Sequence, residues 1–146
     1  MIPVSGISFS ATLDDEGNKY YATVLVNETD RYDLIQPGMV GERIPLQPIN
    51  LTVRNETGSL EITPDRGELK FPKGNYSISY ESAVTSNTIH LLFAEPADVS
   101  FTLPHPFMIT NPLLTSLQPS RSVIEEGNNT TLISWTKVRS VEVRYY

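Results

Sequence analysis

Residues 7–13 read Ile-Ser-Phe-Ser-Ala-Thr-Leu, and this stretch decides the fold class because apolar and hydroxyl side chains alternate throughout it. A period of two places the four apolar side chains on one face of an extended chain and the three hydroxyls on the other. The pattern predicts a half-buried strand. A polar turn at residues 14–18 and a second strand-like run at residues 20–26 complete a predicted antiparallel hairpin.

Short alternating runs continue along the chain and are separated by turn sequences rich in Gly, Pro and Asn. They fall at residues 50–53, 60–62, 69–71, 76–80, 89–93, 99–103, 123–125, 131–136 and 141–146. Residues 32–48 are irregular and predict a long loop with room for one short strand. The sequence therefore predicts an all-β chain: an antiparallel β-sandwich, immunoglobulin-like, with about nine or ten short strands.

One short segment carries a resemblance to known sandwich families. Pro72, Gly74 and Tyr76 stand in a Pro-x-Gly-x-Tyr run followed by alternating apolar residues. The run resembles that of fibronectin type III, transthyretin-like and carboxypeptidase regulatory-like sandwiches. The resemblance implies structural roles for Gly74 and Tyr76, in which the glycine turns the chain and the tyrosine ring packs at a sheet corner. Trp135 and Ile133 share one strand face and are expected in the core.

Size and charge narrow the class of protein. The 146 residues fit one domain, residues 1–146, and a 39% hydrophobic content is enough for a core. The net charge is −6 and no cluster of Lys or Arg is present, so a nucleic-acid partner is not expected. No apolar run approaches the ~20 residues of a membrane helix. We expect the excised ectodomain of a longer, membrane-anchored protein, with the membrane reached only through segments outside this sequence.

Asparagine placement points to an exported protein. Six of the nine asparagines stand in the acceptor pattern for N-glycosylation, whereas composition alone supplies about two. The candidates are Asn27, Asn50, Asn55, Asn75, Asn128 and Asn129. The alternative is that turns are rich in Asn, Ser and Thr in any β protein. Acceptor patterns in a chain without cysteine resemble the composition of archaeal cell-envelope ectodomains, which implies the extracellular face of the cell membrane.

Other candidate sites are weaker. The acidic turn at Asp14, Asp15, Glu16 and Asn18 offers oxygen ligands for calcium but lacks the spacing of a helical calcium loop, and a solvated hairpin tip explains it equally. His90 and His105 are too far apart in sequence to suggest a metal pair. No serine stands in a nucleophile motif, and no glycine-rich loop has the spacing that binds phosphate. We therefore expect that the protein is not an enzyme and that it binds no cofactor or metal.

Residues 103–119 combine apolar side chains with four prolines. The candidates for partner contact are Phe107, Met108, Ile109, Leu113, Leu114 and Leu117. A crossover packed over the sheet is the alternative to an exposed patch for a protein partner or a second copy.

The function expected from the sequence is a non-enzymatic extracellular module with a structural, adhesive or protein-interaction role. The alternative is a carbohydrate- or calcium-binding module. Exposed tyrosines on one sheet face would favour carbohydrate, an exposed segment at residues 107–117 would favour a protein partner, and a histidine meeting a carboxylate in a cleft would favour an enzyme.

Overall fold

The computed structural model describes residues 6–38, 40, 42–84, 87–105, 107, 117–118, 122–127 and 129–145, and all regular elements in them are strands. These strands are β1 (Ile7–Leu13), β2 (Lys19–Asp33), β3 (Ile35–Pro37), β4 (Arg43–Pro45), β5 (Ile49–Asn55), β6 (Gly58–Leu60), β7 (Glu68–Ala83), β8 (Thr88–Pro104), β9 (Leu117–Gln118), β10 (Val123–Glu126) and β11 (Thr130–Arg144). The prediction of an all-β chain is confirmed.

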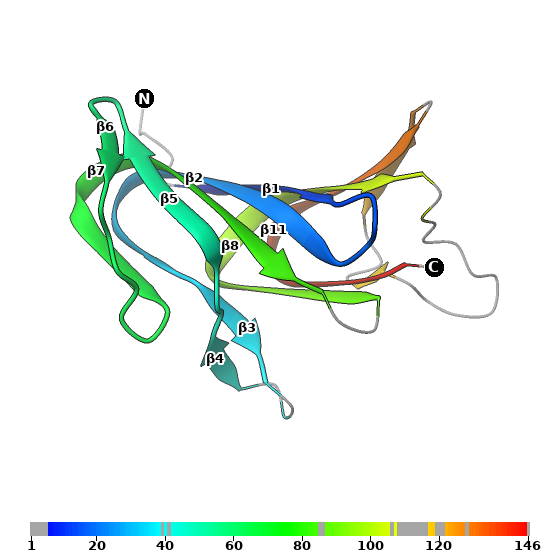
Figure 1. Cartoon of the computed structure of the whole chain (residues 1–146), viewed down its shortest axis with the longest axis horizontal. Coiled ribbons are helices and arrows are strands. Elements are labelled where there is room, and N and C mark those ends of the chain that lie inside the picture. The colour runs from blue at the N-terminus through cyan, green and yellow to red at the C-terminus, as the bar shows by residue number, and fades with distance from the viewer. Residues whose placement is uncertain are drawn as a thin grey trace.

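The strands form one continuous sheet in the order β10-β11-β8-β1-β2-β7-β5-β6, with the β3–β4 hairpin and β9 paired at its margins (Figure 1). β1 runs parallel to β8, with Ile7 beside Ala97 and Thr12 beside Thr102. The described strands thus differ from the two packed antiparallel sheets expected for an immunoglobulin-like sandwich. Alternation within a strand shows which face is buried, but it does not show which strand lies alongside or in which direction it runs.

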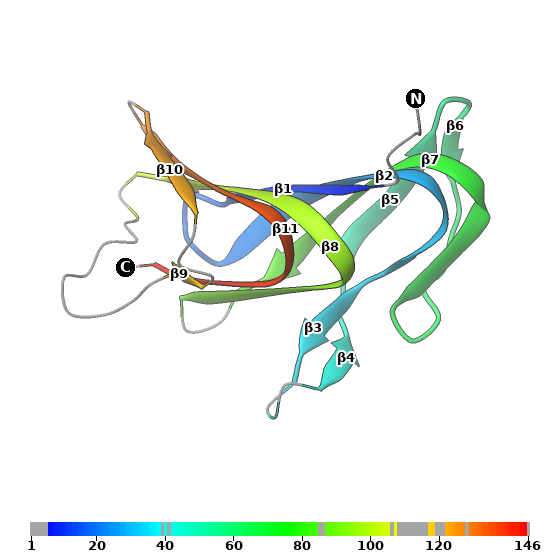
Figure 2. The ribbon, with the colours of Figure 1, turned by 180° about the vertical axis from the view of Figure 1, so that it is seen from behind.

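Four long strands give the sheet its curvature. β2, β7, β8 and β11 are 15 to 17 residues long, and three of them each join two runs that the sequence predicts as separate strands. Register shifts interrupt the pairing of β2 between Val26 and Thr29 and of β11 between Trp135 and Val138. Such bulges bend a strand without ending it, and they also tolerate proline. The sheet curls into a half-barrel (Figure 2).

The core fills the inside of the curl. Phe9 of β1 meets Phe93 of β8 edge to face at 5.4 Å between ring centres, and Tyr20 of β2 meets Phe101 at 5.9 Å. Trp135 is buried, which confirms the prediction of a core anchor. The outward neighbours in the same strands, such as Ser8, are exposed, so β1 has the buried and wet faces that its alternation predicts.

The segment at residues 32–48, predicted as a loop, is more ordered than expected. β2 continues to Asp33, and β3 and β4 then form a short hairpin. Leu34 and Leu46 are buried beneath it, and Leu46 N donates to Leu34 O at 3.0 Å. Pro37 and Pro45 are the last residues of β3 and β4, where no donor is needed, and Pro48 lies in the connection to β5. Proline content therefore misled the prediction here.

Tyr76 has the structural role that its sequence context implies. The side chain is buried, its hydroxyl donates to Pro72 O, and its ring lies 4.1 Å from the ring of Phe71. The contact holds the bend of β7, because it joins residues on either side of Gly74.

Candidate functional site

The acceptor asparagines that the structure describes lie at the molecular surface. Asn27, Asn50, Asn75 and Asn129 are exposed and Asn55 is half-buried, whereas Asn128 lies outside the described residues. They come from the bend of β2, both ends of β5, the bend of β7 and the β10–β11 turn. An enzyme that modifies asparagine must reach the side chain, so the surface position keeps all five described sites as candidates.

Asn55 has the most ordered acceptor geometry. It ends β5 at the tight turn into β6, and its Oδ1 accepts hydrogen bonds from Thr57 N at 2.9 Å, Thr57 Oγ1 at 2.7 Å and Gly58 N at 3.2 Å. The third residue of the acceptor triplet therefore holds the carboxamide of the first, as in an Asx-turn. Three donors on Oδ1 draw electron density toward the oxygen of the carboxamide. None of these three bonds uses Nδ2, which is the atom that would carry a sugar. Gly58 allows the turn with a φ of 135°.

Asn75 and Asn27 lie together where β2 and β7 bend. Asn75 Oδ1 accepts a hydrogen bond from Glu28 N at 2.8 Å, across 47 residues of sequence. Glu28 has a φ of 54°, which is a strained conformation for a residue with a side chain. The hydrogen bond to Asn75 offsets part of this strain at the bulge of β2. The bond uses the oxygen of Asn75, so its Nδ2 does not take part in it.

Asn50 has the opposite arrangement. Its Nδ2 donates to Glu81 Oε2 at 2.6 Å, and Glu81 Oε1 also pairs with Lys19 Nζ at 2.9 Å. Hydrogen bonds from Lys19 and Asn50 hold the pKa of Glu81 below its usual range, so the carboxylate stays charged and keeps the amide nitrogen. Asn50 therefore differs from Asn55 and Asn75, whose hydrogen bonds use the amide oxygen, and the sequence pattern did not make this distinction.

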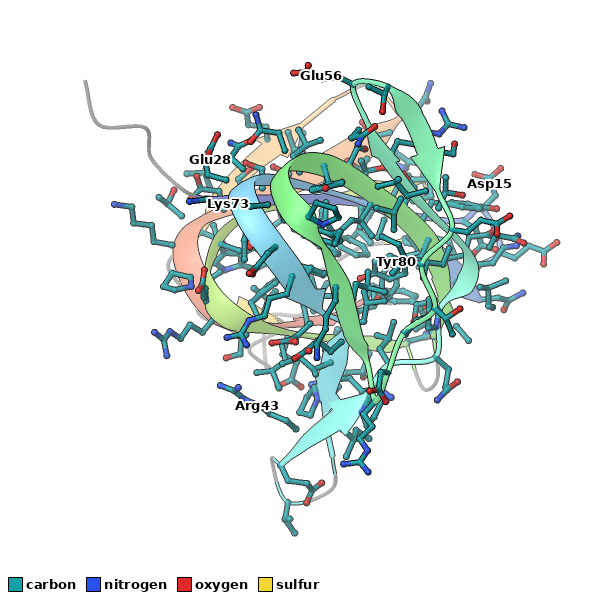
Figure 3. All side chains as sticks on the ribbon, turned by 90° about the vertical axis from the view of Figure 1, so that its left-hand side faces the viewer. Asp15, Glu28, Arg43, Glu56, Lys73 and Tyr80 are labelled. Carbon is teal, nitrogen blue, oxygen red and sulfur yellow. The ribbon has the colours of Figure 1, made fainter. Side chains whose placement is uncertain are left out.

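Two grooves flank these asparagines. The larger, of about 900 Å³, lies where β1, β2, β7 and β8 pass the β3–β4 hairpin, and Asn27 is part of its lining. Its lining carries charges of both signs, and Lys70 pairs with Glu68 at 3.3 Å. The smaller, of about 400 Å³, includes both Asn55 and Asn75. Figure 3 shows Glu28 and Arg43, both from the larger groove, projecting from the sheet, while Tyr80 lies within its curl.

No sequence pattern indicates the larger groove. Its walls come from segments that the bend of β2 brings together, including Arg31, Arg43 and Lys70. The bend depends on a positive φ at Glu28, and glutamate carries no signal for that conformation. The two acceptor patterns at the smaller groove, by contrast, were visible in the sequence.

The acidic turn considered for calcium uses its polar atoms to close the hairpin. Asp14 Oδ1 accepts from Asn18 N at 2.7 Å and from Lys19 N at 3.3 Å, and Asn18 Nδ2 donates to Glu16 Oε2 at 2.9 Å. Within the ranges that the structure describes, no group of three His, Cys, Asp or Glu side chains is placed to hold a metal ion. His90 and His105, both exposed, lie near opposite ends of β8, so the fold does not bring them together.

Phe107 is the one partner-contact candidate whose side chain is described, and it packs against the sheet. Its ring meets Tyr145 edge to face at 5.3 Å and lies against Gly17, whose φ is 74° and where an added Cβ would come within 2.8 Å of the ring. Tyr145 is buried and donates to Gly17 O at 2.6 Å. This arrangement favours the packed crossover at Phe107.

The remaining partner-contact candidates cannot be placed in the same way. Met108, Ile109, Leu113 and Leu114 lie outside the described residues, and the side chain of Leu117 does too. The backbone of Leu117 belongs to β9, which pairs with β11 opposite Val143.

Comparison with known proteins assigns the chain to a family. A model described as a family of unknown function, DUF5803, matches residues 8–146, which is nearly the whole chain. The chain belongs to the DUF5803 family. No curated protein matches it. The described part of this DUF5803 chain contains no helix of the length and apolarity needed to cross a membrane.

Proposed function

We propose that this protein is the exported, N-glycosylated ectodomain of a cell-envelope protein and that it acts as a non-enzymatic structural or adhesive module. The observation that carries the proposal is the Asn55 turn, in which the hydroxyl of Thr57 holds the acceptor side chain with its nitrogen free of those bonds. A turn can contain Asn, Gly and Thr for its own sake, but the sequence holds six acceptor patterns where composition supplies about two, and the five described ones lie at the surface.

The setting follows from composition. A cysteine-free, acidic, Thr-rich chain resembles archaeal envelope ectodomains, so the extracellular face of the membrane is the proposed location. Tyr76 and its bond to Pro72 support a distant relationship to the transthyretin-like and fibronectin type III group. The proposed partners are proteins at the cell surface or further copies of the chain.

Intact mass and peptide mapping of the protein from its native host test the proposal. We expect a glycan on Asn55 and a low occupancy at Asn50. Thr57→Ala should abolish the modification of Asn55, whereas Glu56→Gln, which keeps the acceptor triplet, should leave it in place. An unmodified chain recovered from the cytosol would overturn both the location and the role.

A further inference from the structure

The outer face of the curled sheet carries a continuous row of hydroxyl groups. Cross-strand partners run from β5 through β7, β2, β1 and β8 to β11, and each link is a registered pair. The row consists of Thr52, Ser79, Thr23, Ser10, Ser100 and Ser134. Directly opposed residues point to the same face of a sheet, so six hydroxyls from six adjacent strands stand side by side. We call this set the hydroxyl row.

The hydroxyl row lies on the solvent-exposed face of the sheet. Its strand neighbours, such as Phe9, Val24 and Ile78, are buried on the inner face, so the hydroxyl row points away from the core. Ser10 and Thr23 are exposed, and the other four members are partly exposed. Strands lie about 4.8 Å apart, so the row extends over roughly 24 Å of the surface.

The rows on either side add hydroxyls and one aromatic ring. In the first flanking row, Leu25 lies between its cross-strand partners Ser8 and Ser77. In the second flanking row, Thr12 lies between its cross-strand partners Tyr21 and Thr102. Tyr21 is 47% exposed, whereas the other described tyrosines are buried. Its ring is steadied by Lys19, whose Nζ lies 5.3 Å from the ring centre and pairs with Glu81.

The charge of this face differs from that of the whole molecule. The chain carries 28 charged residues on 146 positions, yet the hydroxyl row has none. The nearest charges lie in the flanking rows, where Glu81 is the direct partner of Tyr21 and Asp98 that of Ser8. Protein surfaces normally intersperse both signs of charge. Serine and threonine make up 28 of 146 residues and hold six consecutive positions of the row, which Val123 of β10 continues beyond Ser134. A surface without positive charge does not attract nucleic acid. The exposed apolar side chains beside the row are those of Tyr21, Leu25 and Val123.

We infer that the hydroxyl row binds a neutral polysaccharide chain. Each hydroxyl donates one hydrogen bond and accepts others, as the hydroxyls of a sugar do, so the two surfaces complement each other without any charge. Tyr21 supplies an exposed ring at the side of the row for the apolar face of a sugar. Adjacent strands are rotated by roughly 20° relative to one another, so a single flexible chain can follow the row while a flat crystalline surface cannot.

Affinity electrophoresis of the unglycosylated recombinant protein, in gels containing dextran, mannan or amylose, tests the inference. We expect retardation by at least one of these neutral polymers and none by alginate or on crystalline cellulose. Ser10→Ala, Thr23→Ala and Ser79→Ala combined should weaken binding at least tenfold, because each lost hydroxyl bond contributes on the order of a fivefold factor. Thr63→Ala, an exposed hydroxyl off this face, is the matched control.

Several outcomes would overturn the inference. They are the absence of retardation in all three gels, retardation by alginate to the same degree, or unchanged binding by a triple variant whose circular dichroism matches the wild type. A dimer in solution that Thr23→Glu dissociates would identify the face as a contact between copies instead. Because the test uses unmodified protein, its result is independent of whether Asn55 carries a glycan.

Discussion

Replacing Tyr32 by Phe tests how the curled sheet responds to alkaline pH. Tyr20, Tyr32 and Tyr80 line the inside of the half-barrel with exposed fractions of 3%, 6% and 6%. Burial raises the pKa of all three hydroxyls, because the phenolate form is poorly solvated there. For Tyr20, hydrogen bonds from Ser82 and Tyr80 offset part of that rise.

The direction of the pH effect follows from proton linkage. In the unfolded chain a tyrosine ionises near pH 10, whereas in the folded protein these three remain protonated to higher pH. Above pH 10 the unfolded state therefore binds fewer protons, and the free energy of unfolding falls as the pH rises. Each tyrosine contributes up to about 1.4 kcal/mol per pH unit, so three together approach about 4 kcal/mol per unit.

Urea denaturation at pH 8, 10 and 11 measures this slope. Tyr32→Phe should reduce the slope by up to about 1.4 kcal/mol per pH unit, since one titrating group is lost. Phe93→Leu is the control, because it removes part of a buried ring without removing a hydroxyl. It should lower stability at every pH and leave the slope unchanged. An identical slope in wild type and Tyr32→Phe would refute the reasoning.

Three further substitutions test other parts of the fold by urea unfolding at neutral pH. Gly67→Ala should cost about 2 kcal/mol or more, because Gly67 has a φ of 86° and the new Cβ would stand 2.5 Å from Leu34 O; an unchanged midpoint would mean that this turn is not constrained. Phe101→Ala should cost about 3 to 5 kcal/mol because the ring is fully buried, and a loss below 1 kcal/mol would contradict the placement of the core. Tyr145→Phe should cost about 1 kcal/mol because the hydrogen bond to Gly17 O is lost. The exchange rate of the amide hydrogens should rise in the turn that contains Gly17 and stay unchanged in β5.

Local alternation was enough to place most strands and their buried faces. Phe9, Ala11 and Leu13 are buried as residues 7–13 predict, and Ile78 and Tyr80 behave in the same way in β7. The curl and the parallel pairing could not be obtained in this way. They depend on which strands meet across long stretches of chain, and on bulges formed by residues such as Glu28 that give no sequence signal for a positive φ.

The candidate sites divide along the same line. The acceptor triplets are local, so the sequence identified them, but their ranking is not local. Asn50 differs from Asn55 as a candidate acceptor because its amide nitrogen is bonded to Glu81, which lies 31 residues further along the chain. The hydroxyl row likewise needs the register between strands, since Ser10 meets Ser100 and Thr23 only through pairing.

Glycosylation and the hydroxyl row would use neighbouring parts of the surface. Asn27 is part of the lining of the 900 Å³ groove, so a glycan there would compete with any ligand for that groove in the native protein. Asn55 and Asn75 do the same for the smaller groove. The hydroxyl row itself contains none of the acceptor asparagines, but Asn27 follows Leu25 on the outward side of β2 and Asn50 lies two residues from Thr52. Glycans at Asn27, Asn55 and Asn75 would thus narrow both grooves, whereas the central hydroxyls Ser10, Thr23 and Ser100 would keep their place in the outer face.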